Sequence, residues 1–193
     1  MNEIIKDYLY STEIQLDNPQ LAVDCLHVEL FLKEAIQDPA PLQDYGSFTS
    51  ANHSKYNLFN FHTAQINKLF RAIQKHVLAV MPKDEYMIQC WLNVFRVGQF
   101  IDWHAHWPAE HKVFHGYYCV NVGDSITSYK FPNDTGAKVQ NKNGLLVYGK
   151  SCGDLHRSSE WDNPEVPRIT IAFDVIPIWN IKDNPVSRHY VPI

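Results

Sequence analysis

The sequence contains two histidines separated by a single residue, His104 and His106, and a third histidine, His156, much later in the chain. If residues 103–107 are extended, the close pair projects from one side, because successive side chains of a strand point to opposite faces. His156 follows a buried-looking segment, residues 144–148, and can supply a third imidazole. Two close ligands and one distant ligand are typical of an open catalytic metal site built on a barrel.

A strand predicted over residues 168–175 carries different side chains on its two faces. Alternate residues from Ile169 to Val175 are apolar and should pack on helices, whereas Arg168 and Thr170 share the opposite face. In a small barrel this face is the interior, where an unpaired guanidinium is costly. We therefore expect the barrel to hold an acidic ligand, whose carboxylate a guanidinium and a neighbouring hydroxyl can bind together.

These residues resemble the ordered pattern of the 2-oxoglutarate- and iron(II)-dependent dioxygenases, on the prolyl-hydroxylase-like side of that superfamily. The usual pattern is H-x-D, a later histidine, and then R-x-S or R-x-T. The matching residues here are His104-Ala-His106, His156 and Arg168-Ile-Thr170, and the resemblance covers roughly residues 86–177.

The resemblance implies a role for each matching residue. The three histidines would bind Fe(II) and form the catalytic centre. Arg168 and Thr170 would hold the far carboxylate of 2-oxoglutarate, and Tyr118, in the segment 116–121, would be a further ligand of that carboxylate. The activity implied is that of an oxygenase that decarboxylates 2-oxoglutarate to succinate and hydroxylates an unidentified substrate, either a small molecule or the side chain of a peptide or protein.

The second position of the motif departs from the family pattern, since His106 stands where aspartate is usual. Three neutral imidazoles leave Fe(II) its full charge and favour dianionic chelators such as 2-oxoglutarate. Asp102 and Glu110 are carboxylates that could replace or join His106, which we rank first because it occupies the matching position. We expect His115 to point away from the site, since it is an odd number of residues from Tyr118.

Three other interpretations stay open. The histidines together with Glu110 also resemble the cupin pattern, whose members act on or bind a substrate without 2-oxoglutarate, but Arg168, Thr170 and Tyr118 are then unexplained. Zinc also accepts three histidines, for hydrolytic or lyase chemistry. An inactive barrel could instead serve as a binding or assembly module.

Composition limits the classes of protein to consider. The 193 residues, 45% of them hydrophobic, suffice for one domain with a sizeable core. A net charge of -4 without a basic stripe argues against nucleic-acid binding. No apolar run is long enough to cross a membrane, no secretory leader is recognisable, and the four cysteines are far apart. We therefore expect a cytoplasmic protein with reduced thiols; the pattern does not indicate its oligomeric state.

The periodicity of the chain indicates which elements must position these residues. Helical spacing predicts one helix from the capping pair Asn18-Pro19 to residue 38 and another from Thr63 to residue 82, with residues 39–60 as loop. From residue 85 the period changes to two. We predict a mainly β protein with N-terminal helices, a double-stranded β-helix of the jelly-roll or cupin type. Its parts would be a support region at residues 1–84, a barrel core at 85–177 and an extended tail at 178–193.

Overall fold

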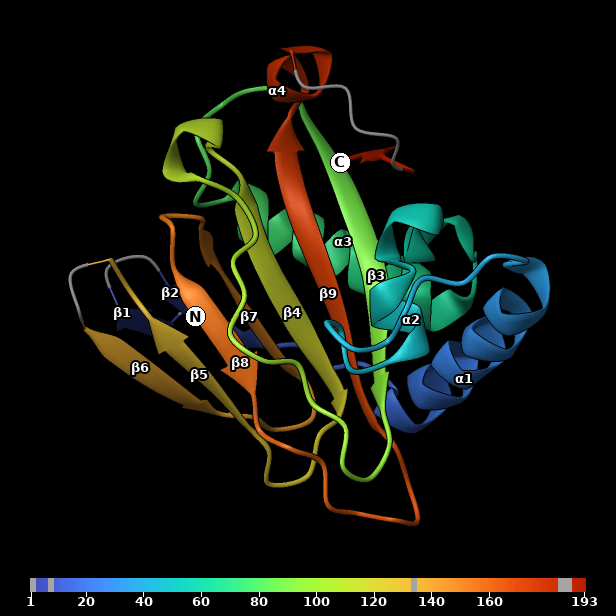
Figure 1. Ribbon diagram of the computed structural model, residues 1–193. Coiled ribbons are helices and arrows are strands. Elements are labelled where there is room, and N and C mark those ends of the chain that lie inside the picture. Colours follow the sequence, from blue (N-terminus) through green and yellow to red (C-terminus); the bar gives the residue numbers. More distant parts are fainter. Residues whose placement is uncertain (1–2, 7–8, 133–134, 184–188) are drawn as a thin grey trace.

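The computed structural model describes the chain except for residues 1–2, 7–8, 133–134 and 184–188. Two antiparallel sheets make up much of the described part, with strand orders β1-β2-β7-β4-β9-β3-β10 and β6-β5-β8 (Figure 1). The strands are β1 (Glu3–Lys6), β2 (Leu9–Glu13), β3 (Tyr86–Phe95), β4 (Phe114–Asn121), β5 (Ile126–Lys130), β6 (Gly136–Gln140), β7 (Leu145–Lys150), β8 (Leu155–Ser158), β9 (Arg168–Pro177) and β10 (Val191–Pro192). The helices are α1 (Asn18–Ala35), α2 (Phe48–Ala51), α3 (Ala64–Leu78) and α4 (Ile178–Asp183), with short 3-10 helices η1 (His53–Lys55), η2 (Leu58–Asn60) and η3 (Ala109–His111).

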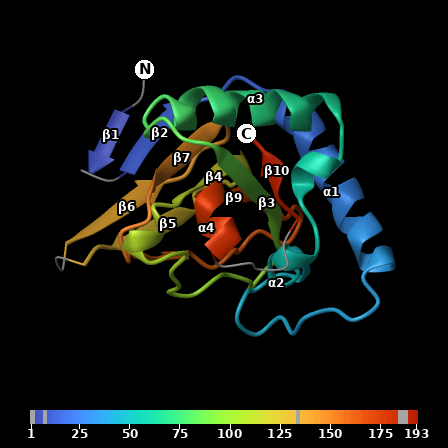
Figure 2. The same cartoon turned by 90° about the horizontal axis from the view of Figure 1, so that it is seen from above.

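The two long helices begin close to where the sequence predicts. The side chain of Asp17, one residue before the expected cap, accepts a hydrogen bond from the backbone N–H of Gln20 at 3.1 Å, and a proline follows in the first turn of α1. Thr63 caps α3 by accepting from the N–H of Ile66 at 3.2 Å. Each helix buries one apolar stripe. Figure 2 shows both helices from above, outside the larger sheet.

Strand β9 lies at the centre of the site-forming part of the larger sheet and is buried along its whole length. It pairs with β3 on one side and β4 on the other. The register places Thr170 opposite Asn93 and Arg168 opposite Phe95. Because side chains alternate along a strand, one face of β9 packs on the helices and the other faces the smaller sheet.

The mainly β class with N-terminal helices is confirmed. The hydrogen bonds of the described strands form two sheets, and a continuous closed barrel is not among them. Residues 39–60, expected as loop, contain α2 and two 3-10 helices, and the tail expected to be extended contains α4 and β10. The hairpin of β1 and β2, which pairs with β7, was not predicted. Within the described part of the chain, none of the helices combines the length and apolarity needed to cross a bilayer.

Candidate active site

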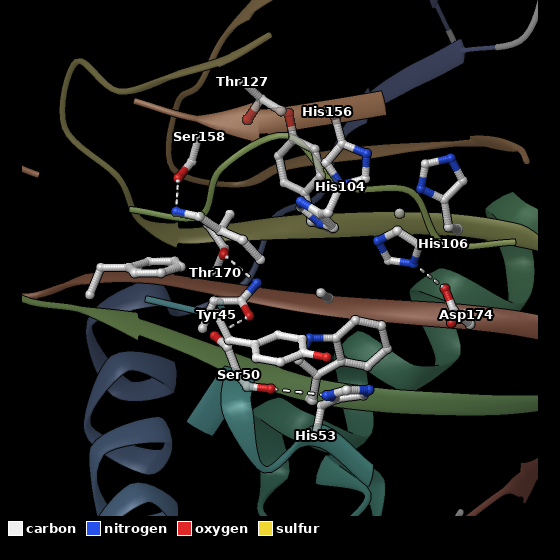
Figure 3. A pocket seen from close by; sticks show the side chains of 18 of the residues that line it. Tyr45, Ser50, His53, His104, His106, Thr127, His156, Ser158, Thr170 and Asp174 are labelled. Atoms are coloured by element: carbon white, nitrogen blue, oxygen red, sulfur yellow. Dashed lines mark hydrogen bonds and ion pairs between the residues drawn. The ribbon is translucent and has the colours of Figure 1, made fainter. Parts of the chain in front are cut away.

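A cavity of about 210 Å³ lies between the two sheets. Strands β3, β4 and β9 contribute its floor, and β5 and β8 of the smaller sheet contribute the facing wall. Residues around α2 and in the segment after β3 complete the lining. Figure 3 shows these side chains pointing toward a common space.

The three predicted histidines meet at one end of this cavity. One nitrogen of each of His104, His106 and His156 lies within 4.8 Å of the corresponding nitrogens of the other two. Residues 103–107 do not form a regular strand, but His104 makes an isolated antiparallel bridge with His156. Two backbone hydrogen bonds of 3.1 and 3.0 Å join this pair of residues, so the main chain itself holds two of the three rings together.

The rings of the H-x-H pair are held from behind by oxygen atoms. His104 donates from Nδ1 to the backbone carbonyl of Asp102 at 2.8 Å. His106 Nδ1 lies 2.6 Å from a carboxylate oxygen of Asp174, and the other oxygen of Asp174 accepts from Nε1 of Trp107 at 2.9 Å. A carbonyl or carboxylate oxygen can only accept, so Nδ1 carries the proton in both rings and Nε2 is left with the lone pair.

Burial keeps these imidazoles in the form that binds metals. Desolvation, followed by the charge of His106, lowers the pKa of His104 to about 4. Desolvation also lowers the pKa of His156 well below its usual value. Burial alone would raise the pKa of Asp174, but the interactions with His106 and Trp107 outweigh it and hold that pKa at about 2. The site therefore presents the neutral rings of His104 and His156 beside the ionised carboxylate of Asp174.

A second group of potential ligands shares His156. His115 Nε2 lies 3.3 Å from a carboxylate oxygen of Asp154, and ligand atoms of His115, Asp154 and His156 also lie within 4.8 Å of one another. Burial favours a higher pKa for Asp154, but its interactions with the two histidines lower the pKa below the usual range. Two histidines and one carboxylate are the ligands of many Fe(II) sites. The residue types of this second group are therefore compatible with a metal site.

The group of three histidines fits an open metal site better. His104, His106 and His156 all line the cavity, whereas Asp154 of the second group does not. The first two rings are only partly buried, while every member of the second group is buried. A catalytic ion needs positions that substrate and cosubstrate can reach. The exposed carboxylates of Asp102 and Glu110, considered as alternatives to His106, belong to neither group.

Arg168 lines the cavity, and the residue as a whole is only 2% exposed. It donates to the backbone carbonyl of Ser159 at 2.6 Å and to Oγ of Ser158 at 2.8 Å, and it stacks on the ring of Phe95 at 4.3 Å. Burial lowers its pKa to about 10. Within the described parts of the chain, no carboxylate forms an ion pair with it. Thr170 also lines the cavity and accepts a hydrogen bond from Asn93 at 3.2 Å.

The placement of Tyr118 differs from the prediction. Its side chain is fully buried on the opposite face of β4, outside the cavity lining, and it donates to Asn18 at the start of α1 at 2.7 Å. Burial raises its pKa to about 12. Tyr117 faces the cavity instead and donates to Asn141 at 3.0 Å. His115 shares the face of Tyr117 and so points into the cavity, contrary to expectation.

The structure also brings a row of aromatic rings to the site that the sequence did not suggest. The ring centroids of Tyr45 and His53 are 5.5 Å apart, those of His53 and Trp91 are 5.4 Å apart, and those of Trp91 and His106 are 5.7 Å apart. Figure 3 shows Tyr45 and His53 across the cavity from His104 and His156. Two of these rings come from the region expected to be loop, where no spacing linked them to the histidines.

Known structures resemble this fold, although no protein-family model and no curated protein matches the sequence. A prolyl-4-hydroxylase from Pseudomonas putida is 14% identical, with a TM-score of 0.51 over 89% of this chain and 94% of that chain. A prolyl hydroxylase from Trichoplax adhaerens, in complex with a hypoxia inducible factor peptide fragment, is 7% identical, with a TM-score of 0.60 over 93% and 88%.

A third similar structure has a different described activity. SnoN, a non-heme alpha ketoglutarate dependent epimerase from nogalamycin biosynthesis, is 9% identical, with a TM-score of 0.56 over 89% of this chain and 77% of that chain. At such identities the likeness concerns the fold and leaves the reaction to be argued from the site. The resemblance to 2-oxoglutarate- and iron(II)-dependent oxygenases, first drawn from the order of His104, His106, His156 and Arg168, is confirmed at the level of the fold.

Proposed function

We propose that this protein is an Fe(II)- and 2-oxoglutarate-dependent oxygenase in which His104, His106 and His156 bind the metal. The three rings converge at one end of a cavity, and each offers one nitrogen within 4.8 Å of the other two. Burial keeps His104 and His156 neutral, as metal binding requires. Fe(II), when bound by these residues, would provide the centre at which the keto acid and oxygen react.

The buried guanidinium of Arg168 is the observation that carries the proposal. Burying an ion without an opposite charge costs on the order of several kcal/mol, and no acidic partner is present in the described residues around it. Two of its N–H groups bind Ser158 and Ser159, which leaves other donors of the fork for a ligand. A carboxylate would supply the missing charge and accept two of these donors at once.

The distance between the two ends of the site fits a short keto diacid. Ser158, which contacts Arg168, follows His156 by two residues on the same face of β8. Two strand residues separated by one other residue are roughly 7 Å apart. An anion held by Arg168 therefore reaches the histidines if its chain has about five carbons. Tyr117 and Thr170 add hydroxyl groups to the lining at this end. We therefore assign the far carboxylate of 2-oxoglutarate to Arg168, Thr170 and Tyr117, with Tyr117 in place of Tyr118.

The substrate would lie against the aromatic row formed by Tyr45, His53 and Trp91. This row lines the cavity next to His106 and opposite the other two histidines. The cavity, at about 210 Å³, has room for a small molecule or for one side chain of a larger substrate beside the cosubstrate. Flat apolar rings position such a group and exclude water from the reacting carbon. Hydroxylation of a small molecule or of a peptide side chain is the reaction that this arrangement supports best.

An anaerobic titration tests the proposal directly. Fe(II) and then 2-oxoglutarate are added to the metal-free protein, and the visible charge-transfer absorption of the chelate is recorded. We expect a band that saturates at one equivalent of each, followed by release of succinate when oxygen is admitted. Binding of Fe(II) without the band and without succinate would favour a cupin-type metal protein. Absence of metal binding would leave only the binding-module interpretation.

A further inference from the structure

Each of the three histidines has an oxygen atom next to its Nδ1 edge. For His104 the oxygen belongs to the carbonyl of Asp102 at 2.8 Å, and for His106 it belongs to the carboxylate of Asp174 at 2.6 Å. In His156, Nδ1 is buried and has no hydrogen-bond partner, and the nearest carboxylate oxygen, from Asp154, is 3.9 Å away. The Nδ1 edge of each ring therefore faces an oxygen atom.

Two of these three acceptors are buried carboxylates. Asp174 is 2% exposed and Asp154 is 5% exposed. Each carboxylate has a second neighbour that helps to fix it: Trp107 donates to Asp174 at 2.9 Å, and His115 Nε2 lies 3.3 Å from Asp154. Two carboxylates are thus buried directly behind the rings.

We propose that Asp174 and Asp154 are positioning residues that take over the charge of the carboxylate ligand that this site lacks. The inference rests on the metal site of the proposed function. Asp174 holds His106, and Asp154 holds His156, with Nδ1 protonated and Nε2 directed at the ion. When Nε2 binds a dication, Nδ1 becomes a stronger donor, and we expect the 3.9 Å gap between His156 and Asp154 to close into a hydrogen bond.

This arrangement explains how a site without a carboxylate ligand can retain a divalent ion. Outer carboxylates raise the basicity of the imidazoles that donate to them, and their removal costs about 10- to 100-fold in metal affinity at sites of this type. The negative charge of the site lies outside the coordination sphere, so it does not occupy a position on the ion. The exposed Asp102 contributes only its backbone carbonyl, so its side chain should not contribute to this effect.

Proton NMR of the Co(II)-substituted protein tests how many imidazoles bind the ion. Each bound imidazole retains one N–H proton on its other nitrogen, and this proton gives a strongly shifted signal that disappears in D2O. We expect three such signals, one for each of His104, His106 and His156. Two signals would show that the ion is held by His115, Asp154 and His156 instead, and would overturn the inference.

Matched asparagine substitutions then test the two carboxylates. We expect Asp174→Asn and Asp154→Asn each to weaken Co(II) binding by about 10- to 100-fold and to move the signal of one ring only. Asp102→Asn is the control and should change neither the affinity nor the spectrum. Thermal unfolding of the metal-free variants distinguishes weaker Co(II) binding from a loss of structure, because the inference requires reduced affinity in a protein that is still folded.

The outcomes are separable from those of the proposed function. Unchanged Co(II) affinity in both folded variants would refute the positioning role, whether or not the wild-type protein binds 2-oxoglutarate. Should an asparagine variant not fold, the count of signals in the wild-type protein still decides the matter. Three signals in a protein that gives no 2-oxoglutarate band would support the ligand arrangement and contradict the oxygenase proposal.

Discussion

The two ends of the cavity differ in how their charges are balanced. At the end formed by the three histidines, imidazole rings face the cavity and carboxylates lie behind them. At the other end, the guanidinium of Arg168 lines the cavity itself, and it is bonded to neutral groups. In the proposed function, the first end binds a cation that still has room for other ligands. The second end binds the negatively charged end of the cosubstrate.

The two ends also differ in how rigidly the fold holds them. Arg168 and Thr170 belong to β9, which is paired on both sides and buried throughout. The H-x-H pair lies in an irregular segment after β3. It is joined to β8 by the backbone bridge between His104 and His156, and to β9 by the hydrogen bond between His106 and Asp174. The anion end is therefore fixed by a central strand, whereas the geometry of the metal end depends on one backbone bridge and on side-chain hydrogen bonds.

Removal of a proposed metal ligand should have the largest effect, because the metal end of the cavity would no longer bind its ion. We expect His156→Ala to reduce metal affinity by more than about 100-fold, because the other two rings then lack the ligand contributed by the opposite sheet. Metal content after gel filtration measures the loss. The exposed His27 on α1 provides the control, since His27→Ala should leave the metal content unchanged. Full metal content in His156→Ala would contradict the assignment of both ligand groups.

Removal of the charge of Arg168 should weaken the binding of 2-oxoglutarate and leave metal binding unchanged. We expect Arg168→Gln to weaken 2-oxoglutarate binding by about 100-fold, since the far carboxylate then loses its charged partner, while Fe(II) affinity stays within about twofold. Titration of the chelate absorption gives both constants. The neighbouring exposed Arg157 offers a matched control in Arg157→Gln. Equal losses of metal and cosubstrate would show that the two ends are not independent.

Substitution of the two adjacent tyrosines of β4 tests which hydroxyl group binds the far carboxylate of 2-oxoglutarate. Tyr117→Phe should raise the concentration of 2-oxoglutarate needed for half-saturation by about fivefold, as expected for one hydrogen bond to a charged group. Tyr118→Phe should leave that concentration unchanged and lower the free energy of unfolding by about 1 kcal/mol, because the bond to Asn18 is lost. The reverse result would restore the assignment to Tyr118.

A pH effect on the stability of the metal-free protein should report the protonation of the buried rings. Burial lowers the pKa of His104 from 6.5 to about 4 and that of His156 in the same direction. The unfolded chain therefore binds more protons between these values, and the free energy of unfolding should decrease as pH falls from about 6.5 to 4. Thermal unfolding across this range measures it. His104→Gln should flatten the decrease; an equally steep decrease would assign it to other groups.

The sequence predicted those features for which the residue types and their periodic spacing indicate the same structure. The long helices followed from their caps and apolar stripes, and the cavity-facing position of Arg168 followed from its alternation with apolar neighbours in β9. The family resemblance pointed to Tyr118 in β4, whereas the cavity lining contains Tyr117. Both faces of that strand are buried, one by helices and one by the smaller sheet, so alternation of polarity could not tell Tyr117 from Tyr118.

Other parts of the site depend on long-range contacts that leave no periodic pattern. Asp174 ends next to His106 only because β9 and the segment after β3 come together in the fold, and the two residues are 68 positions apart. Tyr45 and His53 reach the cavity through the region around α2, whose hydrogen bond between Ser50 and Asn93 ties it to β3 at 2.8 Å. Such contacts are set by tertiary packing, which spacing along the chain does not encode.

The backbone bridge between His104 and His156 has a consequence for the kinetics of the ion. Their separation cannot increase without breaking two main-chain hydrogen bonds, whereas His106 is carried by the irregular segment that follows. In the proposed metal site, the bridged pair would present two ligands at a fixed separation, and His106 would complete the set. The lifetime of a bound ion would then depend on how firmly Asp174 holds the ring of His106.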